Sequence, residues 1–104
     1  MTDTLCKLVF VCPKKTSDNI VEVLLDLDFL LPAFTTFDAD GHGHNFDIAT
    51  SQEQVRGKVG RSVFWLVLPV ADKDKIIKEV SAQIKNPHVT YWVEPILEFG
   101  HLSS

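Results

Sequence analysis

The sequence predicts an α+β domain in which two helices cover one face of a four-stranded antiparallel sheet. Three observations lead to this fold class. Residues 5–12 and 62–68 are rich in β-forming side chains and are apolar at consecutive positions, as in strands that are buried on both faces. A stretch with helical apolar spacing follows each of them. Two shorter β-forming stretches complete the order β-α-β-β-α-β, which is that of the ferredoxin-like fold.

The first half of the chain contains a strand, a helix and a second strand. The strand over residues 5–12 ends at Pro13, and the Thr, Ser and Asp at residues 16–18 are good N-terminal caps for a helix. Pro32 stops the helix, and residues 33–38 are expected to form the second strand because phenylalanine and threonine favour a pleated backbone. The apolar face of the helix comprises Ile20, Val21, Val23, Leu24, Leu25 and Leu27.

The second half contains a further strand, helix and strand. After the strand at residues 62–68, Asp72 can cap a helix that ends before Pro87. Residues 89–93 are expected to form the last strand, and the tail at residues 100–104 is expected to be mobile. The apolar stripe of this second helix comprises Ile76, Ile77, Val80 and Ile84.

A long connection is expected between the second and third strands, over residues 39–60. This stretch holds four glycines and few large apolar side chains. A loop of this length in a small domain is usually functional or disordered. Residues 1–104 are therefore interpreted as one domain with a long loop.

Composition and charge disfavour several classes of function. The net charge of −4 argues against DNA binding, because nonspecific binding needs lysines and arginines to displace counterions. No apolar run reaches the ~18 residues of a membrane-spanning helix, and the N-terminus lacks the basic start of a signal peptide. We therefore expect a cytoplasmic protein without direct membrane insertion. Cys6 and Cys12 lie in one predicted strand, roughly 20 Å apart, so we expect free thiols, which suit a reducing compartment.

The two long strands indicate an oligomer. Two helices can cover only one face of the sheet, yet residues 5–12 and 62–68 are apolar on both faces. An uncovered apolar face of this kind is a binding surface or an interface between subunits.

One polar segment has the donor groups of a metal site. Asp38, Asp40, His42 and His44 occupy alternate positions, so in an extended chain their side chains share one face. Imidazole and carboxylate are ligands for zinc, copper, nickel or cobalt. The sequence therefore predicts a candidate site for a divalent transition metal. The alternative is a solvated polar loop.

A second candidate site lies where the predicted loop returns to the sheet. Lys58 and Arg61 stand beside Gly57 and Gly60, and glycine-flanked cations can hold an anionic ligand. The pattern is not a Walker A motif, because Lys58 is followed by valine instead of serine or threonine. The alternative is again a solvated return of the loop.

Nearly the whole chain resembles the PII signalling superfamily. Thr35, the turn Gly41-His42-Gly43 and the pair Lys58-Val59 stand where PII proteins carry a strand-two threonine, a Gly-Phe-Gly turn and a Lys-Val pair. The resemblance implies a homotrimer whose sheets pack toward a central axis. It also implies a non-enzymatic regulator that binds a ligand such as an adenine nucleotide at a subunit cleft. The ligand-binding residues would be Thr35, Gly41, Gly43, Lys58 and Arg61.

The chain departs from the PII pattern at the segment that grips phosphates. Residues 84–88 lack the Thr-Gly-Lys segment of PII proteins, and His44 stands where those proteins have arginine. The chain is thus similar to a divergent PII-like branch, and more distantly to the CutA family. Some such branches are encoded beside heavy-metal efflux pumps. The resemblance therefore implies a transporter as the regulated partner, or else a role in metal tolerance through the Asp/His segment.

Two other functions are weaker alternatives. RNA-recognition modules share this topology and stack bases on sheet aromatics, but Phe64 and Trp65 are adjacent and so point to opposite faces. Cys12 lies beside Pro13 in an apolar strand, where a reactive thiolate is disfavoured. We find no credible set of catalytic residues in the sequence and expect a protein that acts by binding.

Overall fold

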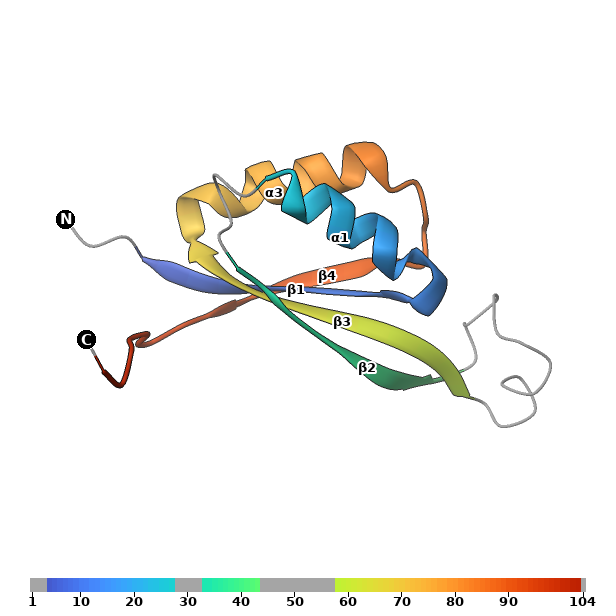
Figure 1. Cartoon of the computed structure of the whole chain (residues 1–104), viewed down its shortest axis with the longest axis horizontal. Helices are drawn as coiled ribbons and strands as arrows, with labels where there is room; N and C mark the ends of the chain where they lie inside the picture. Colours follow the sequence, from blue (N-terminus) through green and yellow to red (C-terminus); the bar gives the residue numbers. More distant parts are fainter. Residues whose placement is uncertain (1–3, 28–32, 44–57, 104) are drawn as a thin grey trace.

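The fold is a four-stranded antiparallel sheet with two helices on one side, and the predicted ferredoxin-like α+β class is confirmed. The computed structural model describes residues 4–27, 33–43 and 58–103 (Figure 1). Strand order across the sheet is β2-β3-β1-β4. The strands are β1 (Leu5–Pro13), β2 (Thr35–His42), β3 (Lys58–Pro69) and β4 (Thr90–Pro95). The helices are α1 (Ser17–Leu25), which follows a 3-10 turn at Lys14–Thr16, and α3 (Val70–Gln83).

Strands β2 and β3 extend further toward their connection than the sequence predicted. The prediction placed residues 39–60 in a loop, but Ala39 pairs with Arg61 and His42 pairs with Lys58 in an antiparallel ladder. The prediction failed because backbone hydrogen bonds hold this ladder, and they require no apolar side chains. The rest of the predicted loop, residues 44–57, lies outside the described residues.

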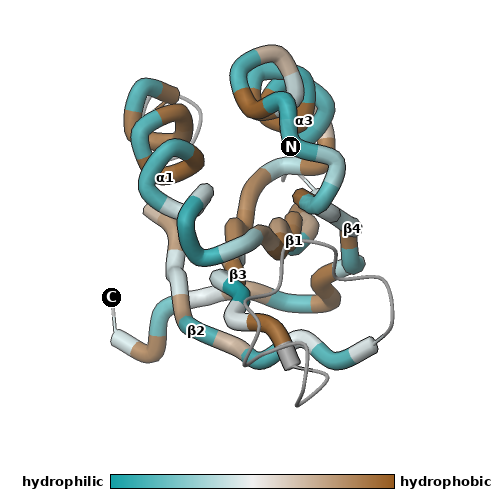
Figure 2. The backbone as a smooth tube through the Cα atoms, turned by 90° about the vertical axis from the view of Figure 1, so that its right-hand side faces the viewer, coloured by the Kyte–Doolittle hydropathy of each residue, from teal (hydrophilic) through white to brown (hydrophobic). Residues whose placement is uncertain are grey.

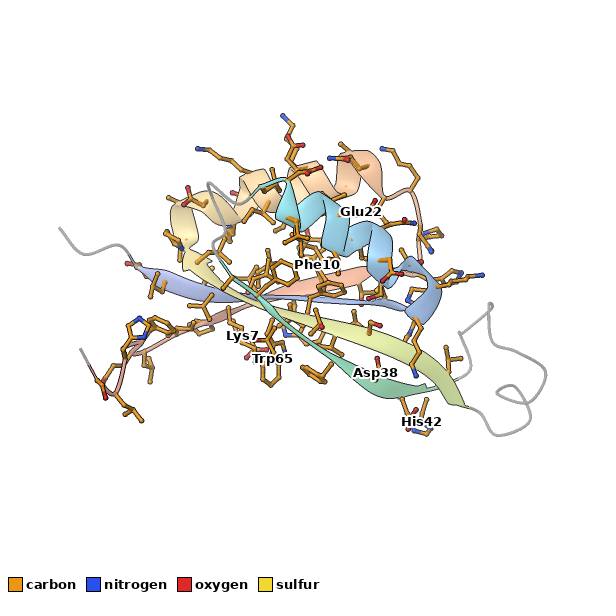
Figure 3. All side chains as sticks on the ribbon, in the orientation of Figure 1. Lys7, Phe10, Glu22, Asp38, His42 and Trp65 are labelled. Atoms are coloured by element: carbon orange, nitrogen blue, oxygen red, sulfur yellow. The ribbon has the colours of Figure 1, made fainter. Side chains whose placement is uncertain are left out.

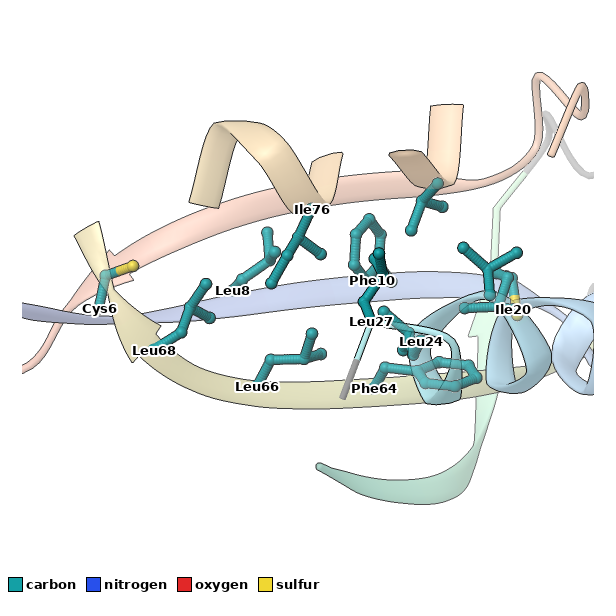
Figure 4. Close-up of a cluster of buried hydrophobic side chains, with 13 residues drawn as sticks. Cys6, Leu8, Phe10, Ile20, Leu24, Leu27, Phe64, Leu66, Leu68 and Ile76 are labelled. Carbon is teal, nitrogen blue, oxygen red and sulfur yellow. The ribbon is translucent and has the colours of Figure 1, made fainter. Parts of the chain in front are cut away.

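The hydrophobic core lies between the sheet and the two helices (Figure 4). Alternate residues of β1 and β3 point into it, because successive side chains of a strand point to opposite faces. The largest buried members are Phe10 and Phe64, and both are closed over by α1 and α3. The other core residues from the central strands are Cys6, Leu8, Cys12, Leu66 and Leu68, and those from the helices include Ile20, Leu24, Ile76 and Val80.

Helix α3 begins three residues earlier than predicted, because its N-cap is Pro69 and not Asp72. The extended backbone of Pro69 ends β3, and the N–H of Val70 donates to the carbonyl of Thr4 at 2.8 Å. The helix ends where Ile84 returns to an extended conformation. Asn86 then ties this turn to the other half of the domain, because its side-chain amide donates to the Thr16 hydroxyl at 3.2 Å.

Both helices lie over the same side of the sheet, as the view along the molecule makes plain (Figure 2). The other side of the sheet, called here the open face, is covered by neither helix. Within the described part of the chain, no helix has the length and apolar character needed to cross a membrane.

Candidate functional site

The open face carries three exposed aromatic side chains, one on each of three strands. Directly paired residues of antiparallel strands share a face, and Val9 of β1 pairs with Trp65 of β3 and with Trp92 of β4. The side chains of Trp65 and Trp92 are 43% and 45% exposed, whereas Val9 between them is fully buried. Phe37 of β2 extends this surface and is 40% exposed. The result is a continuous apolar surface of a kind that soluble monomers rarely leave open.

Trp65 is held in place from two sides. The ring of Phe37 meets it edge to face, with 4.8 Å between the ring centroids. The ammonium group of Lys7 lies 3.6 Å from the centroid of its ring, which is a cation–π contact (Figure 3). These contacts fix the orientation of the indole, so Trp65 is a rigid part of the open face.

The polar groups of the open face form a second, small network. The indole N–H of Trp92 donates to a carboxylate oxygen of Glu94 at 2.6 Å. Glu94 pairs in register with Lys7 across β4 and β1, so one negative and one positive side chain stand side by side on this face. The face is therefore aromatic with a balanced pair of charges, unlike the strongly basic surfaces that bind nucleic acids.

A pocket of about 490 Å³ lies at one end of the open face, where β2 begins and β3 ends. The C-terminal segment, residues 96–103, forms one of its walls through Phe99 and His101. Thr35, a predicted ligand-binding residue, lines the pocket beside Trp65. Apolar side chains make up most of the remaining wall, among them Leu5, Phe34, Val67 and Pro69.

The structure does not bring the five predicted ligand-binding residues together. Thr35 lies at the start of β2, whereas Gly41 lies six residues further along the same strand, which is roughly 20 Å away. Gly43 follows directly after β2, and its φ of 147° is a conformation that favours glycine. Lys58 begins β3 opposite His42. Gly41, Gly43 and Lys58 therefore lie at the end of the β2–β3 hairpin that is farther from Thr35.

Arg61 is part of β3, not of a solvated loop end. It pairs with Ala39 and Pro13 in register, and its side chain is only 7% exposed. Burial lowers the pKa of the guanidinium group from its usual value. The sequence pattern did not predict this burial of Arg61.

The predicted common face of the Asp/His segment is confirmed for three of its four members. Asp38, Asp40 and His42 pair with Ser62, Gly60 and Lys58, and all three lie on the helix side of the sheet. His44 lies outside the described residues. In the part of the chain that is described, no group of three His, Cys, Asp or Glu side chains could hold a metal ion.

The described members of this row are spread along the strand. Residues at alternate positions are roughly 7 Å apart along the backbone. Asp38 is also engaged elsewhere, because the ammonium group of Lys14 lies 3.7 Å from its carboxylate.

Both cysteines are buried and unpaired, as predicted. Burial is the main cause that raises the pKa of the Cys12 thiol to about 11, although nearby Arg61 opposes the shift. At neutral pH this thiol is protonated, which disfavours a role as a nucleophile.

Sequence reasoning missed several residues of the open face and its pocket. Alternation in β3 did place Trp65 opposite the core, but no local pattern linked it to Lys7, Phe37 or Trp92. These contacts join different strands and depend on the register of the sheet. No pattern in the sequence placed Phe99 and His101 in a pocket, because their position there depends on the path of the C-terminal segment.

Comparison with known proteins identifies the family. The family described as "Protein of unknown function (DUF3240)" matches residues 1–103. The chain belongs to the DUF3240 family. A crystal structure of a DUF3240 family protein from Shewanella baltica is similar over 98% of this chain and 100% of that one, with 22% identity and a TM-score of 0.78. No curated protein matches the sequence.

Two more distant structures share the fold. A Bacillus cereus protein related to NIF3 is similar over 97% of this chain but only 27% of its own length, with 16% identity and a TM-score of 0.67. A functionally unknown protein from Pediococcus pentosaceus is similar over 97% of this chain and 100% of its own, with 9% identity and a TM-score of 0.65. At these identities the similarities establish the fold alone.

Proposed function

We propose that this DUF3240 protein is a non-enzymatic regulatory protein of the PII-like type. In this proposal three copies assemble through their open faces, and a small ligand binds beside β2. The connection between β2 and β3 then presents the ligand-dependent state to a partner protein, for which a membrane transporter is the first candidate. The protein acts by binding and not by catalysis.

The observation that carries the proposal is the exposed aromatic open face. Phe37, Trp65 and Trp92 are each 40–45% exposed and lie on three strands of one surface, β2, β3 and β4. Burying the exposed part of one tryptophan side chain contributes about 2 kcal/mol at 25 cal/mol per Å². Three such side chains per subunit, with Val67 beside them, provide a sufficient driving force for association between copies.

The hairpin of β2 and β3 supports the regulatory part of the proposal. Gly41 and Lys58 lie on opposite strands at the base of the connection, where His42 and Lys58 face each other in register. A ligand bound at this base would contact both strands that lead into the connection. Its binding could therefore change the order of the connection, which is a common way in which a ligand controls a partner-binding segment.

The turn before β4 differs from a phosphate-binding turn in how it uses its polar groups. The N–H of His88 donates to the side-chain oxygen of Asn86 at 2.9 Å, and the amide group of Asn86 donates to Thr16. These groups satisfy one another within the domain. Because these groups are already paired, the turn favours a ligand other than a nucleoside triphosphate. A smaller anion held by Lys58 is still consistent with the proposal.

The oligomeric state tests the assembly step. We expect size-exclusion chromatography with light scattering to give three times the chain mass of 11.7 kDa. Trp65→Glu introduces a charge into the proposed interface and is expected to give a monomer. Leu25→Glu is the matched control, because Leu25 is an exposed apolar residue on α1, on the other side of the sheet. A wild-type monomer at micromolar concentration would contradict the proposal.

A thermal-shift panel tests the ligand step. Adenine nucleotides and inorganic anions are compared with zinc, nickel, copper and cobalt, since a ligand of the native state raises the melting temperature. A rise with an anion that is lost in Lys58→Ala supports the proposed site. A chelator-reversible rise that is lost in His42→Ala instead supports the alternative, a metal-tolerance protein that uses Asp38, Asp40, His42 and His44.

A further inference from the structure

The pocket at the end of the open face has the size of a small-molecule site. Its volume of about 490 Å³ lies within the roughly 300–1,000 Å³ range of ligand pockets. Three aromatic walls, Phe34, Trp65 and Phe99, come from three separate segments of the chain. The hollow is therefore a product of the tertiary fold and of the path of the C-terminal segment.

Two of the three aromatic walls are held by contacts with other segments of the chain. Phe37 and Lys7 fix Trp65, as described above. Phe34 contacts the buried ring of Phe64, with 6.1 Å between centroids. Phe99 meets the ring of His101 edge to face at 5.8 Å. A ligand that enters has few side chains to order, and a preorganised site binds more tightly for that reason.

The polar groups of the pocket are few and carry little charge. Among the described residues that line it, the polar side-chain groups are the Thr35 hydroxyl, the Trp65 indole N–H and the His101 imidazole. None of these lining residues is a carboxylate, a lysine or an arginine. A polyphosphate would lose its hydration here without gaining cations, which is a costly exchange.

We infer that this pocket binds a planar aromatic ligand with a single polar or anionic group, and that it rejects nucleoside polyphosphates. The ring lies among Phe34, Trp65 and Phe99, and the polar group meets His101 and Thr35. The inference goes beyond the proposed function, because the pocket lies at the start of β2, roughly 20 Å from Gly41 and the proposed ligand site at the other end of that strand. It assigns a role to the C-terminal segment, which closes the pocket.

Two probes with the same ring system separate the parts of this inference. Phenylnaphthylamine is neutral, and anilinonaphthalene sulfonate adds one negative charge to the same rings. The chain has two tryptophans, so Trp92→Phe leaves Trp65 as the single fluorescent reporter. We expect both probes to quench Trp65 saturably, and we expect millimolar ATP to displace neither.

Substitutions in the C-terminal segment locate the site without disturbing the core. Phe99→Ala is expected to lower the binding affinity for both probes by about fivefold or more, because it removes an aromatic wall. His101→Ala is expected to lower the affinity for the sulfonate by a similar factor and the affinity for the neutral probe by less than about twofold. Leu102→Ala is the matched control, because Leu102 is fully exposed and does not line the pocket. It is expected to change neither affinity.

Three results would overturn the inference: no saturable quenching of Trp65, unchanged affinity in Phe99→Ala, or displacement of the probes by ATP. Light scattering on the wild-type chain, which keeps Trp92 on the open face, separates this failure from that of the proposed function. A trimer that binds neither probe refutes the pocket alone. A monomer whose Phe99-dependent probe binding is intact refutes the proposed assembly and leaves the pocket in place.

Discussion

At the scale of single residues, the face of the sheet decides what each side chain does. Phe64 and Trp65 are neighbours in β3, yet Phe64 is fully buried and Trp65 is 43% exposed. The sequence predicted this difference, because the two-residue period of a strand requires it. It did not predict that Arg61 is buried, since a cation directly after a glycine is typical of a loop end. Only the pairing of β3 with β1 and β2 places Arg61 in the sheet.

The thiol of Cys12 provides a pH-dependent test of burial. Its pKa is raised from the ordinary 9.0 to about 11 in the folded protein, mainly by burial. Below pH 9 the thiol is protonated in both states and does not affect stability. As the pH rises above 9, the unfolded thiol ionises and the folded one does not, so the unfolded state is stabilised. By pH 10.5 this loss amounts to about 2 kcal/mol.

Urea unfolding at pH 8 and pH 10.5 measures this loss. We expect the difference between the two pH values to be smaller in Cys12→Ala than in the wild type, because the variant has no thiol to ionise at this position. Other groups titrate over this range in both proteins and cancel in the comparison. Equal losses in the two proteins would show that burial of Cys12 has no such effect.

At the scale of elements, sequence patterns located the strands and helices but misplaced their ends near the β2–β3 connection. The central strands were predictable because β1 and β3 are apolar on both faces. The ends of β2 and β3 were not, because residues 39–42 and 58–60 are mostly polar or glycine and become ordered through the ladder between them. The order of the strands in the sheet is the one expected for a β-α-β-β-α-β chain. The contacts on the open face could not be predicted, because they depend on the register in which the strands pair.

The two faces of β3 can be separated by substitution. Phe64→Ala leaves a cavity in the core and is expected to lower the free energy of unfolding by about 3–5 kcal/mol. Trp65→Ala removes a partly exposed side chain and is expected to cost a monomeric subunit about 1 kcal/mol. The same change removes an anchor of the proposed interface, so it is expected to weaken assembly strongly.

These two variants need two measurements each. Urea unfolding at low protein concentration reports the stability of the single subunit, and light scattering reports assembly. The expected pattern is a destabilised Phe64→Ala protein and a stable but less assembled Trp65→Ala protein. If Trp65→Ala behaved like Phe64→Ala in unfolding and kept its assembly, the open face would be a structural surface and not an interface.

At the scale of the whole molecule, one face of the sheet is buried under the helices and the other, the open face, is not covered. The two helices close the core on one side. The aromatic residues on the other side stay partly exposed in a single subunit, so their exposed surface contributes no stabilisation by burial. The sequence predicted an uncovered apolar face from the two-faced strands alone. It did not predict the pocket beside that face, because the pocket combines the start of β2, the end of β3 and the C-terminal segment.

If the open face joins subunits, the melting temperature depends on protein concentration. Assembly removes folded monomer from the unfolding equilibrium, so the folded state gains stability as the concentration rises. For three identical subunits, a hundredfold increase in concentration stabilises each one by about 2 kcal/mol. This corresponds to a rise of roughly 5–10 °C for a domain of this size.

Trp65→Glu is the variant that makes this measurement decisive. Its carboxylate would be buried without a partner in the assembled state, so we expect the variant to melt at one temperature across the same concentration range. Leu25→Glu, on the side of α1, is expected to keep the concentration dependence of the wild type. A wild-type melting temperature that does not change over a hundredfold range would contradict the assembly of copies of this chain through the open face.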